Sequence, residues 1–228
     1  MHEIAEGLKR AVELIATLDP EVMSITARTL QIALASTLLA AIINVPLGGL
    51  IYFHSFNGKR IFINFIQTLY GLPTVTVGLL VFLLVSRSGP LGGMELLFTP
   101  AGIVIGQTIL ITPIMLGLTI SALGGVSPDI KETVISLGAN EAQTIIAIIR
   151  EAKPAVFAAV LLGFGRALSE VGVAMMIGGN IRGYTRVLTT AIALETSMGN
   201  LGFSLALGII LITLSLLINL ILNIVQWR

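Results

Sequence analysis

Long apolar runs recur along the whole chain and are separated by short polar intervals. The runs cover about residues 24–53, 61–86, 96–125, 154–179 and 201–226. A helix needs roughly 20 residues to cross the hydrocarbon core of a bilayer, and each run reaches that length. The pattern therefore predicts an all-α integral membrane protein with five core transmembrane helices in one domain, residues 24–228.

The first 23 residues show a different pattern, because apolar side chains recur there at every third or fourth position. These side chains are Ile4, Leu8, Val12, Ile15 and Leu18, with charged residues between them. The periodicity predicts an N-terminal amphipathic helix within residues 1–23, on the membrane surface or against the rest of the chain. It should end near Asp19 and Pro20. The segment has neither a basic start nor an uninterrupted apolar run, which argues against a secretory signal.

Two of the apolar runs contain helix breakers. In the first run, Asn44 lies close enough to Pro46 to help satisfy the carbonyl that this proline frees. In the second run, Pro73 stands beside Thr74 and Thr76. Irregular backbone at membrane depth is tolerated only where protein or water covers it. Pro73, Thr74 and Thr76 are therefore candidates for a translocation pathway, with a kinked packing helix as an equal alternative.

The third and fourth runs carry polar groups near their centres. The cluster of Gln107, Thr108 and Thr112 predicts a face turned to other helices or to a cavity rather than to lipid. In the fourth run, Arg166 and Glu170 are four residues apart, which places opposite charges on one helix face. We expect them to form a buried ion pair that stabilises helix packing; the alternative is a functional site on the pathway.

Two polar intervals have structure of their own. Residues 180–200 enclose an apolar stretch that is too short to span, so it predicts a re-entrant or interfacial element. Residues 127–153 form the only long charged interval in the second half of the chain, and Pro154 marks its expected end. This interval predicts two helices joined by a turn outside the lipid.

The interval 127–153 carries signals for helix ends. Ser127 can cap a helix that starts at Pro128, and Gly138 suits the left-handed residue that ends it. Asn140 followed by Gln143 predicts a capping box that opens the next helix. Apolar residues of the first helix share one face, namely Ile130, Val134 and Leu137. A short amphipathic helix between membrane spans requires a partner for that face.

Composition supports the membrane assignment and excludes several kinds of site. The chain is 55% hydrophobic and 11% charged with a net charge of +1, and it has no basic block that would bind nucleic acid. The absence of cysteine excludes disulfides and thiolate metal sites, and two histidines far apart do not suggest a metal site. No Gly-rich phosphate loop with Lys-Ser or Lys-Thr occurs. We therefore expect no catalytic residue, no metal and no cofactor in this chain.

Within the charged interval, Glu132-Thr133-Val134 followed by Gly138-Ala139 resembles the EAA loop of ABC importer permeases. The resemblance implies the type I (MetI-like) permease fold, with residues 127–153 as a cytoplasmic helix-turn-helix coupling loop. In that family the short helix of the loop sits in a groove of a separate ATPase and transmits its closure to the membrane helices. Glu132 and Gly138 match the family pattern, and the resemblance implies that contact with the ATPase involves Glu132, Leu137, Gly138, Ala139, Asn140 and Glu141.

Three further stretches resemble permeases of oxyanion importers. Residues 163–172 (GFGRALSEVG) are similar to the molybdate, tungstate and sulfate permeases, while residues 178–186 (GGNIRGYTR) and 189–196 (TTAIALET) are similar to the tungstate-specific group. The resemblance implies a homodimer in the inner membrane of a prokaryote, two ATP-binding subunits that hold ATP and Mg, and an extracellular or periplasmic oxyanion-binding protein. Tungstate is the first expectation for the anion, molybdate the second, and sulfate or another oxyanion follows.

Charge distribution and topology complete the expectations. Five spans place the termini on opposite sides, and a full count gives equal numbers of basic residues on the two sides. Without the N-terminal segment and Arg28, the count favours a cytoplasmic coupling loop and C-terminus with the N-terminus outside. An ATP-independent secondary transporter or channel is the rival, and it predicts repeated halves and unpaired charges along a route. A membrane enzyme is a weaker rival, because no carboxylate pair or histidine cluster is evident.

Overall fold

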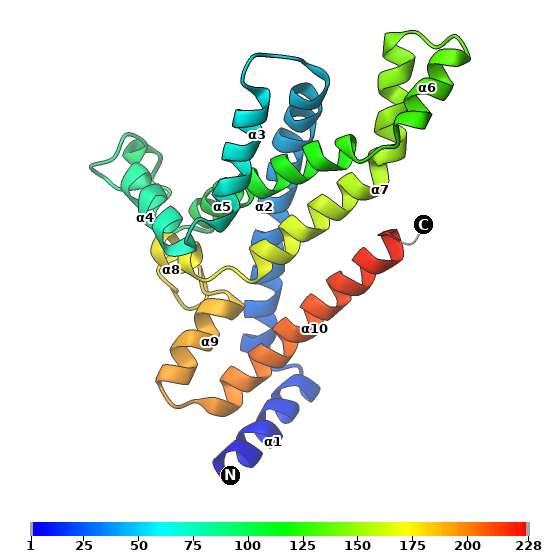
Figure 1. Ribbon diagram of the computed structural model, residues 1–228. Helices are drawn as coiled ribbons and strands as arrows, with labels where there is room; N and C mark the ends of the chain where they lie inside the picture. The colour runs from blue at the N-terminus through cyan, green and yellow to red at the C-terminus, as the bar shows by residue number, and fades with distance from the viewer. Residues whose placement is uncertain (1, 227–228) are drawn as a thin grey trace.

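The computed structural model describes residues 2–226 of the chain, and side chains from residue 5 to residue 225. Helices make up the described part, and no strand occurs in it (Figure 1). They are α1 (His2–Ala16), α2 (Pro20–Phe53), α3 (Lys59–Thr68), η1 (Leu69–Gly71), α4 (Thr74–Val85), η2 (Gly92–Met94), α5 (Pro100–Gly124), α6 (Pro128–Ser136), α7 (Glu141–Leu168), α8 (Gly172–Gly178), α9 (Leu188–Ser197) and α10 (Leu201–Gln226). The predicted all-α class is therefore confirmed.

Within residues 2–226, three helices, α2, α5 and α10, are individually long and apolar enough to cross a membrane. The second apolar run is instead a broken pair, in which α4 is bent by 100° from α3 and η1. The break falls at the predicted proline, because Pro73 is the residue before the first turn of α4. The fourth run is also divided, between α7 and α8, so the number of five core helices stays a prediction.

Helix α7 differs from the expectation at its start. The prediction that Pro154 marks a boundary is wrong, because α7 runs without interruption from Glu141 to Leu168. A proline inside a helix removes one hydrogen bond, to the carbonyl four residues earlier. That carbonyl belongs to Arg150, an exposed residue, so water can take the place of the missing donor. The same helix therefore leaves the charged interval and enters the apolar fourth run.

Helix α1 packs against the rest of the chain, one of its two expected positions. Its inner face contains small residues, with Ala11 fully buried and Gly7 against Leu205 of α10, together with the buried Leu14. The predicted apolar stripe is only partly buried, because Leu8, Val12 and Leu18 are about half or more exposed. Ile4 of that stripe lies outside the described side chains.

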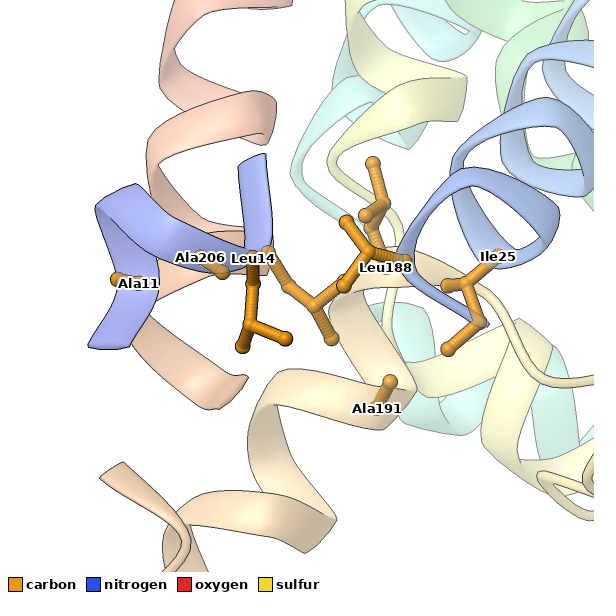
Figure 2. Packing of buried hydrophobic residues seen from close by; sticks show 8 residues of the cluster. Ala11, Leu14, Ile25, Leu188, Ala191 and Ala206 are labelled. Carbon is orange, nitrogen blue, oxygen red and sulfur yellow. The ribbon is translucent and has the colours of Figure 1, made fainter. Parts of the chain in front are cut away.

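Small side chains allow four helices to meet at this end of the molecule. Figure 2 shows Ala11 and Leu14 of α1 facing Ala206 of α10, with Ile25 of α2 and Leu188 of α9 completing the cluster. Lipid tails are as apolar as leucine, so contacts between membrane helices are stabilised by the van der Waals packing of closely fitted side chains and not by removal of apolar surface from water. Helix α6 lies at the opposite end of the molecule, with the α2–α3 turn (Figure 1).

Candidate functional site

The two ends of α6 are closed by local hydrogen bonds. Ser127 accepts a hydrogen bond from the Asp129 amide at 3.3 Å, and Pro128 occupies the first helical position. At the other end Gly138 has φ +85° and its amide donates to the Ile135 carbonyl at 2.9 Å. The next amide, of Ala139, donates to the Val134 carbonyl at 3.0 Å, which completes a Schellman motif. The predicted caps of this helix are present.

The start of α7 is fixed in the same way. Asn140 accepts from the Gln143 amide at 2.9 Å, and the Gln143 side chain accepts from the Asn140 amide at 2.9 Å. This is the predicted capping box, and the Thr144 hydroxyl adds a hydrogen bond to the Asn140 carbonyl at 3.0 Å. Since caps close both sides of the turn, α6 is held at a defined angle to α7 rather than on a loose loop.

The surface of α6 combines exposed apolar and charged groups. The residues of the predicted apolar face differ in exposure: Ile130 and Val134 are half-buried, whereas Leu137 is 81% exposed. Ile135, which is 52% exposed, joins Leu137 on the outside. The remaining candidate positions are exposed or half-buried around them, namely Glu132, Gly138, Ala139, Asn140 and Glu141. An exposed apolar tip of this kind on a capped helix is suited to a protein partner.

A cavity of about 490 Å³ lies between α6, the start of α7 and the end of α2. Lys131 and Glu141 line it together with Tyr52 and Phe53. Lys59 closes the end of α2, since its ammonium donates to the Tyr52 carbonyl at 2.6 Å and lies 5.5 Å from the centre of the Tyr52 ring. The polar α2–α3 turn and α6 therefore share one end of the molecule.

The two broken helices meet at their breaks. A Cβ atom on Gly172, the first residue of α8, would lie 2.7 Å from the Thr74 hydroxyl and 2.8 Å from the Val75 amide nitrogen. A Cβ on Gly78 of α4 would lie 3.2 Å from the Gly172 carbonyl. Glycine thus permits close contact between α4 and α8. Pro73 and Thr76 are exposed and Thr74 is half-buried, so this break reaches the surface of the single chain.

The predicted ion pair between Arg166 and Glu170 is absent from the ion pairs of the described residues, and that expectation is wrong. Helix α7 ends at Leu168, so the four-residue spacing no longer places the two side chains on one face. Glu170 is 2% exposed and accepts a hydrogen bond from the Val173 amide at 3.0 Å, which satisfies a free donor at the start of α8. Its carbonyl accepts from the Thr189 hydroxyl at 2.6 Å.

The polar cluster of the third run connects helices, as one of its alternatives predicted. Gln107 is 3% exposed; its side chain donates to the Ala167 carbonyl at 3.2 Å and accepts from Ser36 at 3.0 Å. Thr108 donates to the Ser36 carbonyl at 3.2 Å, and Thr112 to the Thr108 carbonyl at 2.8 Å. These bonds tie α2, α5 and α7 together. A pathway role for Gln107, Thr108 and Thr112 stays a prediction.

Asn44 belongs to the same network, but with a different partner from the one expected. Its side chain donates to the Ala40 carbonyl at 2.8 Å and to the Thr112 hydroxyl at 3.1 Å. The carbonyl freed by Pro46 belongs to Ile42, four residues earlier, so Asn44 does not compensate for the proline. Asn44 acts in helix packing.

An arginine cluster that the sequence pattern did not reveal lies at the end of the molecule away from α6. Arg186 is 9% exposed and forms an ion pair with Glu195 of α9 at 3.3 Å, and Arg28 donates to the Gly183 carbonyl at 2.8 Å. Arg182 binds Glu21 of α2, with Nε–Oε1 at 2.7 Å, and this hydrogen bond raises the pKa of the Arg182 guanidinium above its usual value. The sequence signal that could have indicated this cluster is the pair of opposite charges, Arg186 and Glu195, on either side of the short apolar stretch 187–194.

Metal binding finds no support in the part of the chain that the structure describes, because no group of three His, Asp or Glu side chains there is placed to hold an ion. The candidate site therefore consists of two features. One is the capped helix α6 with its exposed apolar tip, and the other is the pair of helix breaks near Pro73 and Glu170, which α7 connects to α6.

Comparisons with known proteins identify the family of the chain. Residues 44–228 match the family described as binding-protein-dependent transport system inner membrane component. The tungstate uptake system permease protein TupB of Peptoclostridium acidaminophilum is 42% identical over 96% of each chain. TupB of Campylobacter jejuni subsp. jejuni is 36% identical over 96% of this chain and 91% of that one.

Among solved structures, an amino acid ABC transporter with histidines shares the fold. Its TM-score is 0.70 at 17% sequence identity, over 94% of this chain and 96% of the other. The family match covers most of the chain, and the two relatives extend over nearly all of it. The chain therefore belongs to the family of binding-protein-dependent transport system inner membrane components, and it is a multi-pass permease of an ABC transporter in the inner membrane of a prokaryote.

Proposed function

We propose that the chain is the permease of an ATP-driven importer for a tetrahedral oxyanion, with tungstate as the anion. Two copies would form the translocation pathway, two ATPase subunits would bind the two copies of α6, and an external binding protein would deliver the anion. The ATPase subunits would hold ATP and Mg, while this chain contributes no catalytic group. The coupling loop and the C-terminus would face the cytoplasm, and the N-terminus would lie outside.

The observation that carries the coupling role is the combination of caps and exposure on α6. Leu137 is 81% exposed and Ile135 52% exposed on a helix whose two ends are closed by hydrogen bonds. A helix of fixed orientation can transmit a displacement, whereas an uncapped loop would absorb it. Exposed apolar residues on such a helix favour a protein partner over water. We therefore assign Glu132, Leu137, Gly138, Ala139, Asn140 and Glu141 to contact with the ATPase.

Helix α7 supplies a mechanical connection from α6 to the interior. It has 28 residues, which at 1.5 Å per residue is about 42 Å. It begins in the capping box beside α6 and ends where α7 and α8 separate, next to the break of α3 and α4. Closure of the ATPases would move α6, α7 would transmit the motion, and the paired breaks near Pro73, Thr74, Thr76 and Glu170 would change shape.

Support for tungstate comes from the names of the relatives. The two TupB proteins are named as tungstate uptake permeases and align over nearly the whole chain. Selectivity in such a system would lie mainly in the binding protein, so molybdate is the second candidate and sulfate the third. An ATP-independent secondary transporter is the rival, and it would transport anion without the ATPase.

The experiment is ATP hydrolysis in proteoliposomes that contain this chain, its genetically neighbouring ATPase and the binding protein. Tungstate, molybdate and sulfate are compared at equal low concentrations. Stimulation by tungstate alone is the expected result. If the intact complex responds to none of the three, the oxyanion proposal is wrong; if the chain transports anion without the ATPase, the secondary-transporter rival is right.

A further inference from the structure

A polar pocket of about 340 Å³ lies between α7 and α10, inside the region that the apolar runs assign to the membrane. Arg166 and Ser169 line it from the α7 side, and Ser215 and Asn219 line it from α10. The rest of the lining is apolar, with Leu161, Leu162, Ile218 and Leu222. A cation and three neutral hydrogen-bonding side chains therefore meet in one recess of an otherwise apolar helix pair.

The charge of Arg166 is not compensated within the described part of the chain. The ion pairs there involve Arg10, Arg182 and Arg186, and none involves Arg166. The acid nearest in sequence, Glu170, lies on the far side of the end of α7 and binds the Val173 amide. An uncompensated charge at membrane depth is costly unless an opposite charge or water accompanies it. The arginine is thus available to an anion.

Exposure indicates that something other than lipid covers this face. Asn219 and Ser169 are exposed on the single chain, although they lie in apolar runs. Polar residues recur at every fourth position along α10, at Ser215, Asn219 and Asn223, and so form one stripe. The Ser169, Ser215 and Asn219 side chains each donate one hydrogen bond to the carbonyl four residues earlier on the same helix. The side-chain oxygens and the second amide hydrogen of Asn219 stay open, and lipid offers them no partner. The stripe therefore faces water or protein, and it leads from the pocket toward the end of α10.

We propose that this recess is an oxyanion contact site on the translocation pathway, with Arg166 as the charged contact. The proposal rests on the proposed function and adds the residues that would touch the anion. A guanidinium presents parallel N–H groups that match two oxygens of a tetrahedral dianion, and the second amide hydrogen of Asn219 can donate to a third. A lipid phosphate has the same chemistry, so the test must separate the two sources.

The test uses the absence of cysteine from the chain, because any single introduced thiol is then the only one it carries. The variants Ser215→Cys and Asn219→Cys are each assembled with the ATPase and the binding protein. Each complex is then treated with one of two thiol-specific thiosulfonate reagents, of which one carries a negative sulfonate group and the other a positive ammonium group. Thr213→Cys is the matched control, since Thr213 is exposed on α10 but lies off the polar stripe. The readout is the rate of thiol labelling, which does not depend on transport.

Arg166 should favour the anionic reagent. Unit charges about 4 Å apart in water change a rate by about fivefold, and more in a drier site, so Arg166→Gln should slow anionic labelling at least fivefold. Arg166→Lys, which keeps the charge, should preserve the preference. Millimolar tungstate should protect the thiol when Arg166 is present and should not protect it in the Arg166→Gln variant. Thr213→Cys should react slowly with both reagents.

Three results would overturn the inference. The first is an anionic labelling rate that is the same before and after Arg166→Gln, and the second is protection of the thiol by anionic lipid instead of tungstate. The third is a thiol that reacts in the isolated chain but not in the assembled complex. The last result would place the stripe in a protein interface. Failure of the proposed function is separate, because it appears as absent anion-stimulated ATP hydrolysis in the unmodified complex. Size-exclusion chromatography of each variant establishes that the complex has assembled.

Discussion

Gly138 offers the most direct test of how α6 is coupled to α7. Its φ of +85° lies in the left-handed region, and a Cβ atom added there would meet nothing within 4 Å. Any effect of a small substitution must therefore come from the backbone and not from a clash. The two hydrogen bonds of the Schellman motif depend on this conformation, because they are donated by the amides of Gly138 and Ala139.

The size of the effect follows from that conformation. A left-handed backbone costs a non-glycine residue roughly 1–2 kcal/mol, and a β-branched side chain lies at the upper end or beyond. That free energy corresponds to a factor of about 5 to 30 in the population of the closed turn. Gly138→Val should therefore open the turn most, Gly138→Ala less, and Gly138→Asn least, because asparagine tolerates this region.

The assay measures tungstate transported per ATP hydrolysed in proteoliposomes. Gly138→Val should lower this ratio about fivefold or more, whereas Gly138→Asn should remain near the unmodified protein. Insertion into the membrane should not change, since α6 contains no buried residue and lies outside the packed helices. Normal uptake by Gly138→Val would refute the coupling role, and equal losses with Asn and Val would refute the conformational reason.

Three further predictions concern the interior. Gly117→Ala should destabilise the protein because its Cβ would collide with the Tyr70 hydroxyl. Tyr70→Phe, which removes that unpartnered buried hydroxyl but keeps the ring carbon 2.8 Å from the added Cβ, should partly rescue it in a double-mutant cycle of thermal unfolding. Gln107→Leu should lower the free energy of unfolding by about 1–3 kcal/mol, because the Ala167 carbonyl and the Ser36 hydroxyl both lose this hydrogen-bond partner. Unfolding in detergent measures the change, with Gln107→Glu as the comparison. Glu170→Gln should retain the cap of α8 while Glu170→Ala should increase amide exchange at Val173; equal exchange in both would contradict the capping role.

Local signals in the sequence predicted the region around α6 well. Ser127, Gly138, Asn140 and Gln143 act through hydrogen bonds to residues two to five positions away, so no distant contact is required to specify them. The apolar runs likewise determined the all-helical class, because helices satisfy their own backbone inside a membrane. Pro154 was misjudged because a proline can be accommodated inside a helix when its lost acceptor faces water.

Tertiary structure alone decided which polar groups meet. Arg166 and Glu170 were expected to pair because a continuous helix would align them, but the break after Leu168 directs Glu170 to α8 and leaves Arg166 beside α10. Arg186 is buried between Glu195 of α9, nine residues later, and Glu21 of α2, which is far away along the chain. Periodicity in a sequence shows which residues share one face of a single helix. Where a helix breaks, and which side chains meet on either side of the break, depend on how the helices pack. The sequence therefore determined the membrane helices and the capped turn, and packing determined where the charges lie.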